Sequence, residues 1–165
     1  MPKRILAIFA ATGAAFCLAS ALYAAPASSA DKTFVGKVSQ GGMYEVVASQ
    51  YAEQKAIAPN VKDLAIAEVH DHQGVNSRLK AIAAQTDIPV VATLSSEFQQ
   101  RLAALKSVPS GQFDAAYIAD MQKIHAKDEK LFAQEAIDGS SNFKSFAHQT
   151  DLIVKRHIGA LHGLD

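Results

Sequence analysis

The apolar residues of this chain recur every three or four positions over long stretches, which is the spacing of one face of an α-helix. Pro59, Pro89 and Pro109 stand between these stretches and not inside them, as expected because proline is poorly tolerated within a helix. The pattern therefore predicts four long helices. They span about Lys32 to Ile57, Val61 to Thr86, Gln112 to Ile137 and Ser141 to Leu161.

Residues suited to helix ends mark two short connections between these helices. Asn60 is predicted to cap the second helix, and Ser110 or Gly111 is predicted to begin the third. The run Asp138 to Ser140 predicts the turn of a helical hairpin, with Gly139 as the stop and serine as the restart.

The connection between the second and third helices is the one long crossover, residues 87–111. A short helix is predicted within it from Ser95 through Leu105, and only Ile88 to Leu94 has strand character. We predict an all-α fold, a four-helix bundle with one long crossover containing a short extra helix. Gly41 and Gly42 in the first helix are expected to permit close approach of a neighbouring helix or a local kink.

Acidic and histidine side chains interrupt the apolar faces of all four long helices. A buried carboxylate or imidazole is costly unless it is paired, hydrogen-bonded or bound to a metal. Such side chains on four helices therefore indicate one common interior site. They are Glu45 in the first helix, Glu68 and His72 in the second, His125 and Asp128 in the third, and His157 in the last.

Carboxylate and imidazole groups from facing helices are the ligands with which helical bundles build metal sites. These donors suit zinc, copper, iron or manganese, and they do not choose among them. Asp71 and Asp128 are candidates for holding ligand side chains from behind. The predicted ligands themselves are Glu45, His72, His125 and His157, with Glu68 as an extra or alternative one.

Two other interpretations of the same residues stay open. In the first, the Glu and His side chains form a hydrogen-bonded core that sets helix register in a structural or interaction module. In the second, they form a di-metal redox centre, which usually requires Glu-x-x-His motifs that this sequence lacks. The nearest pairs, Glu68 with His72 and His125 with Glu129, are four residues apart. The other histidines, His70, His148 and His162, are predicted to be surface residues.

The first 30 residues have the composition of an export signal. Met1 to Arg4 is basic, Ile5 to Ala24 is almost continuously apolar, and Ala25 to Ala30 supplies small residues for cleavage. We expect a signal peptide over residues 1–30, a single domain over residues 31–165, and a periplasmic or outer-membrane-associated location. The apolar run is also long enough for an uncleaved membrane anchor, which is the alternative.

Composition narrows the classes of function. The only cysteine, Cys17, lies in the signal, and Phe16 before it is unsuited to lipoprotein processing. Removal of the signal leaves 135 residues, enough for one hydrophobic core, with 14 basic against 16 acidic residues. No basic stripe remains to bind nucleic acid, and no membrane-spanning segment is expected after cleavage. The sequence also lacks a nucleophile elbow and a phosphate loop.

One ordered set of residues runs through the chain after the signal: Phe34, Gly41 to Val46, Val61-Lys62, Asp71-His72, Phe113-Asp114, Tyr117, His125, Phe146-Ala147 and His157. This set resembles the bacterial exported family called domain of unknown function 4142. The resemblance implies a ferritin-like four-helix bundle, export to the periplasm or the outer-membrane side, frequent naming as an outer membrane protein, and no established reaction. The family's recurring acids and histidines fall on Glu45, Asp71, His72, His125 and His157, whereas Glu68 stands where relatives commonly have methionine.

Overall fold

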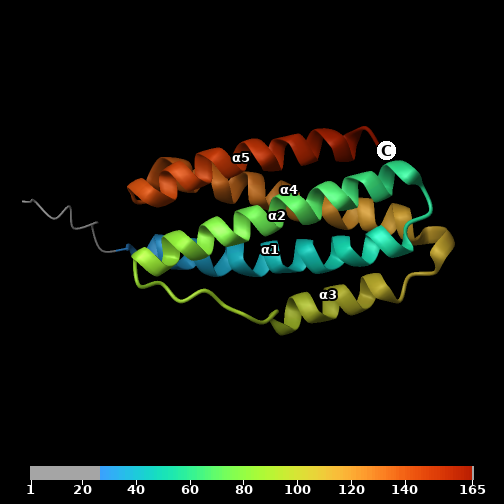
Figure 1. The fold of residues 1–165 in the computed structure, drawn as a ribbon, viewed down its shortest axis with the longest axis horizontal. Helices are drawn as coiled ribbons and strands as arrows, with labels where there is room; N and C mark the ends of the chain where they lie inside the picture. The colour runs from blue at the N-terminus through green and yellow to red at the C-terminus, as the bar shows by residue number, and fades with distance from the viewer. Residues whose placement is uncertain (1–26, 165) are drawn as a thin grey trace, which may run out of the picture.

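The computed structural model describes residues 27–164, which fold into five α-helices and contain no strand (Figure 1). Every predicted helix is present, and each end lies within three residues of its predicted position. Residues 1–26, which hold most of the predicted signal, lie outside the described residues. The helices are α1 (Ser29–Lys55), α2 (Pro59–Gln85), α3 (Ser96–Lys106), α4 (Ser110–Asp138) and α5 (Ser141–His162).

The four long helices lie side by side, and each has two long neighbours. α1 packs against α2 and α4, while α5 packs against α4 and α2. The crossover runs along the length of the bundle and carries α3, which contacts α1 and α4 (Figure 1). Because the crossover returns the chain to the end at which α2 began, α2 and α4 run in the same direction.

The N-terminus of α1 is held by a reciprocal pair of hydrogen bonds. Ser28 Oγ accepts a bond from the Asp31 N–H at 3.0 Å, and Asp31 Oδ2 accepts one from the Ser28 N–H at 2.7 Å. The second oxygen of Asp31 accepts a bond from the Ser140 N–H at 3.0 Å. This capping box starts α1 three residues before the predicted position, so the predicted domain boundary at residue 31 falls in its first turn.

The prediction that Asn60 caps α2 is wrong. The capping position belongs to Ala58, and Pro59 is the first helical residue, where a missing N–H costs no helical hydrogen bond. The side chain of Asn60 instead accepts a bond from the adjacent Val61 N–H at 3.1 Å. The predicted start of α4 at Ser110 and the Gly139-Ser140 turn before α5 are confirmed.

The hydrophobic core consists of two clusters with a polar layer between them. One cluster includes Tyr44, Phe113 and Met121, and the other includes Phe34 and Phe146. Along α2, α4 and α5, the inward-facing Glu and His side chains of this layer lie between the positions that contribute to the two clusters, and on α1 Glu45 directly follows Tyr44 of the first cluster. The polar layer is therefore separated from water along the bundle axis by apolar side chains on both sides.

The Gly41-Gly42 pair permits the close approach that the sequence predicts. A Cβ atom at Gly42 would collide with the side chain of Asn76 on α2. At Gly41 the nearest atoms to such a Cβ would be the carboxylate oxygens of Asp128 and a methyl group of Ile124, each 3.9 Å away. Gly42 thus leaves room for the Asn76 side chain between α1 and α2 beside the polar layer.

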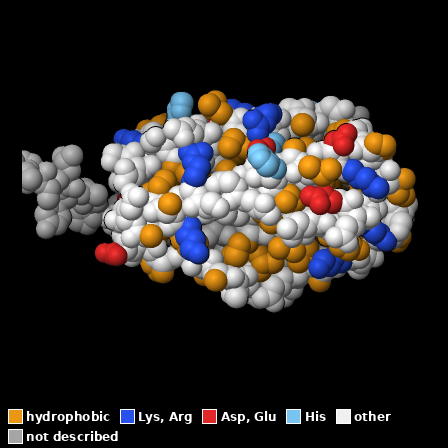
Figure 2. Space-filling model, in the orientation of Figure 1, with side chains coloured by type: hydrophobic (Ala, Val, Ile, Leu, Met, Phe, Trp, Pro, Cys, Tyr) orange, Lys and Arg blue, Asp and Glu red, His pale blue; other side chains and the backbone are white. Residues whose placement is uncertain are grey.

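The charged side chains are dispersed over the face of the molecule that Figure 2 shows. Lys and Arg side chains lie singly among neutral ones on this face, and the acidic side chains are also scattered. Within residues 27–164, none of the helices combines the length and apolar character required to cross a membrane.

Candidate metal centre

The polar layer takes its side chains from four helices, and three of them supply its centre. Glu68 and His72 are one turn apart on α2 and so face the same way. His125 enters from α4 and His157 from α5, and all four side chains are at most 2% exposed. The three imidazole rings form a nearly regular triangle, with ring centroids 5.6, 5.4 and 5.3 Å apart.

Glu68 lies at the point where the three rings converge. Its Oε2 is 3.1 Å from Nε2 of His72 and 3.1 Å from Nδ1 of His157, and its Oε1 is 3.3 Å from Nε2 of His125. Nε2 of His125 is also 3.2 Å from Nδ1 of His157. One ligand atom from each of these four residues lies within 4.8 Å of every other.

The opposite nitrogen of each ring has its own partner outside this group. His125 Nδ1 donates to the carbonyl oxygen of Met121 at 2.9 Å, and His157 Nε2 donates to Asp71 Oδ2 at 2.8 Å. Nδ1 of His72 is 3.1 Å from Oε2 of Glu45. A neutral imidazole that donates through one nitrogen carries a lone pair on the other. His125 and His157, in their neutral forms, thus carry a lone pair on the nitrogen that faces the centre, while Glu45 holds the His72 ring from behind.

The centre also contains three buried polar atoms that have no partner in hydrogen-bonding geometry among the described residues. They are both carboxylate oxygens of Glu68 and Nε2 of His72. Buried acceptors without donors are rare because each costs the free energy of its lost hydration. A positive ion removes this cost, and ligand atoms bound to one zinc ion would lie about 3.4 Å apart. The contacts of 3.1 to 3.3 Å in the centre are close to this value.

The electrostatics of the group favour a cation in the same way. Burial opposes ionisation of Glu68, but contacts with His125, His157 and His72 outweigh it and hold its pKa well below the usual value. Burial lowers the pKa of His125, yet the adjacent Glu68 carboxylate outweighs this and raises it. An ionised Glu68 thus draws positive charge into the layer, as a proton or as a metal ion.

The family described as "Domain of unknown function (DUF4142)" matches residues 18–164. The chain belongs to this family. Its fold is similar to that in the crystal structure of a DUF305 fragment from Deinococcus radiodurans, with a TM-score of 0.74 and 16% sequence identity over 84% of this chain and 97% of the fragment. At this identity the likeness concerns the fold alone. No curated protein matches the sequence.

The DUF4142 chain arranges the predicted site residues in two shells. Glu68, His72, His125 and His157 meet at the centre. Glu45 lies outside that group, because its carboxylate contacts the outer nitrogen of His72 and its other oxygen is 3.7 Å from the outer nitrogen of His125. Glu45 as a ligand thus stays a prediction, while its position suits orientation of the His72 ring.

The remaining predicted residues of the DUF4142 chain occupy distinct places. Asp71 accepts the hydrogen bond from His157 described above, and Asp128 lies beside Glu45. His70, His148 and His162 are exposed, as predicted. Glu129, four residues beyond His125, lines a separate cavity with Ile158 and Leu161.

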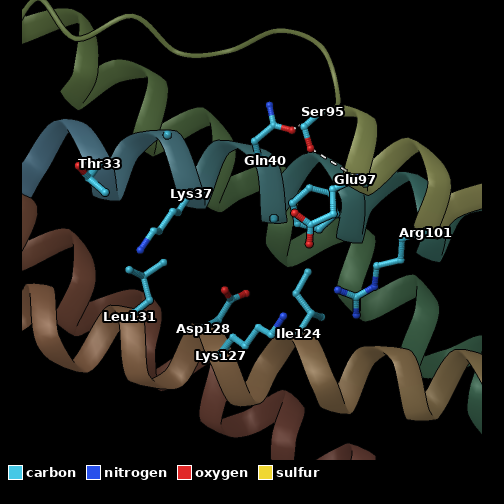
Figure 3. Close-up of a pocket in the computed structure, with 13 residues that line it drawn as sticks. Thr33, Lys37, Gln40, Ser95, Glu97, Arg101, Ile124, Lys127, Asp128 and Leu131 are labelled. Carbon is cyan, nitrogen blue, oxygen red and sulfur yellow. Dashed lines mark hydrogen bonds between the residues drawn. The ribbon is translucent and has the colours of Figure 1, made fainter.

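Asp128 connects Glu45 with a cavity of about 550 Å³ between α1, α3 and α4 (Figure 3). Its carboxylate points into this space, which the side chains of Lys37 and Lys127 also border. Burial raises the pKa of Glu45 well above its usual value, with further increases from Asp128 and then Glu68. Burial also raises the pKa of Asp128. Glu45 is thus favoured in its neutral form.

Two groups around the centre of the DUF4142 chain were not predicted from the sequence. One is the main-chain carbonyl of Met121, which lies one turn before His125 and carries no side-chain signal. The other is Arg156, whose guanidinium contacts Asp71 Oδ2 at 2.5 Å. Its position next to His157 in the sequence was the one available hint.

Proposed function

We propose that this protein binds one transition-metal ion through Glu68, His72, His125 and His157. The observation that supports this function is the convergence of three imidazole nitrogens and one carboxylate, of which both Glu68 oxygens and His72 Nε2 have no hydrogen-bond partner among the described residues. Nitrogen and oxygen donors of this kind suit zinc, copper, iron or manganese. Three neutral imidazoles and one carboxylate leave a net positive charge on a divalent ion, which the outer acidic residues can balance.

The proposed role is metal handling or protection from stress in the cell envelope. The basic and apolar N-terminal segment supports export, to the periplasm or to the outer membrane. Membership of the DUF4142 family and the packing of four long helices around a polar layer support a ferritin-like bundle as the scaffold. In this scaffold Glu45, Asp71 and the Met121 carbonyl hold the three rings, and the apolar clusters exclude water from the layer.

Metal analysis of protein purified without a histidine tag tests the proposal. We expect about one ion per chain after exposure to zinc, copper, iron or manganese, together with a higher unfolding temperature. Glu68→Gln should abolish both effects because it removes the charged ligand. Glu129→Gln is the matched control, since this acid is one turn from His125 but outside the centre. No bound metal and no thermal shift with any of the four ions would refute the function.

A hydrogen-bonded core without metal is the second candidate, favoured by the lowered pKa of Glu68 among the imidazoles. In that case Glu68→Gln would alter the free energy of unfolding and would leave every metal affinity unchanged. A di-metal redox centre is a third candidate, for which the adjacent Glu45 and Asp128 carboxyl groups would be needed as additional ligands. Two ions per chain and a spectroscopic signature of a bridged pair would support it.

A further inference from the structure

A continuous chain of polar contacts joins the candidate centre to the surface between α2 and α5. The imidazole of His70, whose side chain is 87% exposed, lies with Nδ1 3.2 Å from Asp71 Oδ1. The other oxygen of Asp71 accepts from His157 Nε2 at 2.8 Å, and His157 Nδ1 is 3.1 Å from Glu68. One carboxylate thus contacts both an exposed and a buried histidine.

His157 is also the member of the centre that borders a surface cavity. This cavity has a volume of about 230 Å³ and lies between α2 and α5, where Leu64 and Ala160 form apolar parts of its wall. Arg156 lines it as well, and its guanidinium contacts Asp71 Oδ2. Acidic, basic and histidine side chains lie together on this part of the face shown in Figure 2.

The larger cavity on the α1 and α4 side is a poorer route for a cation. Lys37, Lys127 and Arg101 line it together with Glu97 and Asp128 (Figure 3), and Arg101 is already paired with Asp120. A divalent ion entering there must pass the two lysine ammonium groups, which repel it. It would then reach Glu45, which faces the outer nitrogens of the rings and not the lone pairs at the centre.

We propose that His70 and Asp71 form a loading site at which a divalent transition-metal ion is captured before it passes His157 into the centre. An imidazole and a carboxylate are suitable ligands for such an ion at the surface. Arg156 acts as a latch, because its guanidinium contacts Asp71 Oδ2, the oxygen beside His157 that the ion must reach after capture at Oδ1. This inference rests on the proposed metal-binding function and adds the route and its control.

A loading site has a kinetic signature that a structural residue lacks. His70 makes no contact with the centre, so its removal leaves the free energy of the bound state unchanged. By microscopic reversibility, a group on the route alters the association and dissociation rates by the same factor. The dissociation constant therefore stays constant while both rates change. A residue that only supports the fold would instead change the affinity or the stability.

Stopped-flow mixing of the metal-free full chain with Co²⁺, followed through the visible absorption of the bound ion, tests the route. We expect His70→Ala to slow association and dissociation by the same factor and to leave the dissociation constant unchanged. Arg156→Gln should accelerate association by removing the latch. His148→Ala, which removes an exposed histidine elsewhere on α5, is the control and should leave both rates unchanged.

The outcomes separate the loading site from the proposed function. If His70→Ala binds Co²⁺ with unchanged association and dissociation rates, the loading site is overturned and the proposed metal centre is not affected. Slower association in Asp128→Asn, with no change in His70→Ala, assigns the route to the α1 and α4 cavity and also overturns the inference. Absence of Co²⁺ binding by the unmodified chain, with none of the other ions bound at equilibrium, overturns both proposals.

Discussion

The position of Glu45 behind His72 leads to a quantitative prediction for the variant Glu45→Gln. In the structure Glu45 contacts the outer nitrogen of His72, whereas Glu68 contacts the inner nitrogens of all three rings. Glu45→Gln should therefore weaken metal binding and Glu68→Gln should remove it. Because burial and neighbouring acids raise the pKa of Glu45 and favour its neutral form, glutamine should preserve the stability of the metal-free protein.

The magnitude follows from the role of an orienting residue. Loss of such a contact usually lowers metal affinity about 10- to 100-fold, or about 1.4 to 2.7 kcal/mol. A ligand present at 1,000 times its dissociation constant stabilises the folded state by about 4.1 kcal/mol, so Glu45→Gln should retain about 1.4 to 2.7 kcal/mol. For a domain of this size, each kcal/mol corresponds to about 3 to 4 °C in unfolding temperature. The metal-induced shift should fall from about 12–16 °C to about 4–11 °C.

Differential scanning calorimetry with and without zinc measures these shifts, and competition with a chelator gives the dissociation constants directly. Glu129→Gln serves as the control for loss of an acid near His125. If Glu45→Gln abolishes binding as completely as Glu68→Gln, Glu45 is itself a ligand and the two-shell arrangement is wrong. An unchanged zinc affinity in Glu68→Gln would also refute the arrangement, because Glu68 would then not be a ligand.

Three further predictions concern stability. Burial and neighbouring acids raise the pKa of Glu135 from 4.5 to about 7. Between these two pH values the folded state binds more protons than the unfolded state, so the free energy of unfolding falls as the pH rises. Glu135→Gln should raise the unfolding temperature at pH values above about 7 and have little effect below about 4.5, as calorimetry across pH will show. Gly42→Ala should destabilise the fold by about 1–3 kcal/mol in urea denaturation, and adding Asn76→Ala should recover most of this loss. Tyr117→Phe should lower the free energy of unfolding by about 1–3 kcal/mol, because the buried Ser49 hydroxyl, 2.8 Å from the Tyr117 hydroxyl, loses its hydrogen-bond partner. Adding Ser49→Ala to this variant should restore part of the lost stability.

The helices and their buried faces could be predicted from the sequence because both depend on local features. Helical periodicity specifies which side of each helix is apolar, and proline marks where helices cannot continue. Phe34, Glu45, His72 and His157 are buried as their positions on those faces predict. The error at Asn60 has the same local origin, since proline at the first helical position competes with asparagine as a start signal.

By itself, the sequence determined which side chains turn inward, and so predicted that Glu and His groups from four helices meet. Only the tertiary structure decided which of their atoms meet. Periodicity describes rotation about one helix axis, whereas a contact also depends on how far each helix is shifted along its neighbours. That shift places Glu68 at the centre, Glu45 behind His72, and Arg156 against Asp71. The Met121 carbonyl shows the same limit, because a main-chain group can hold a ring from any residue type.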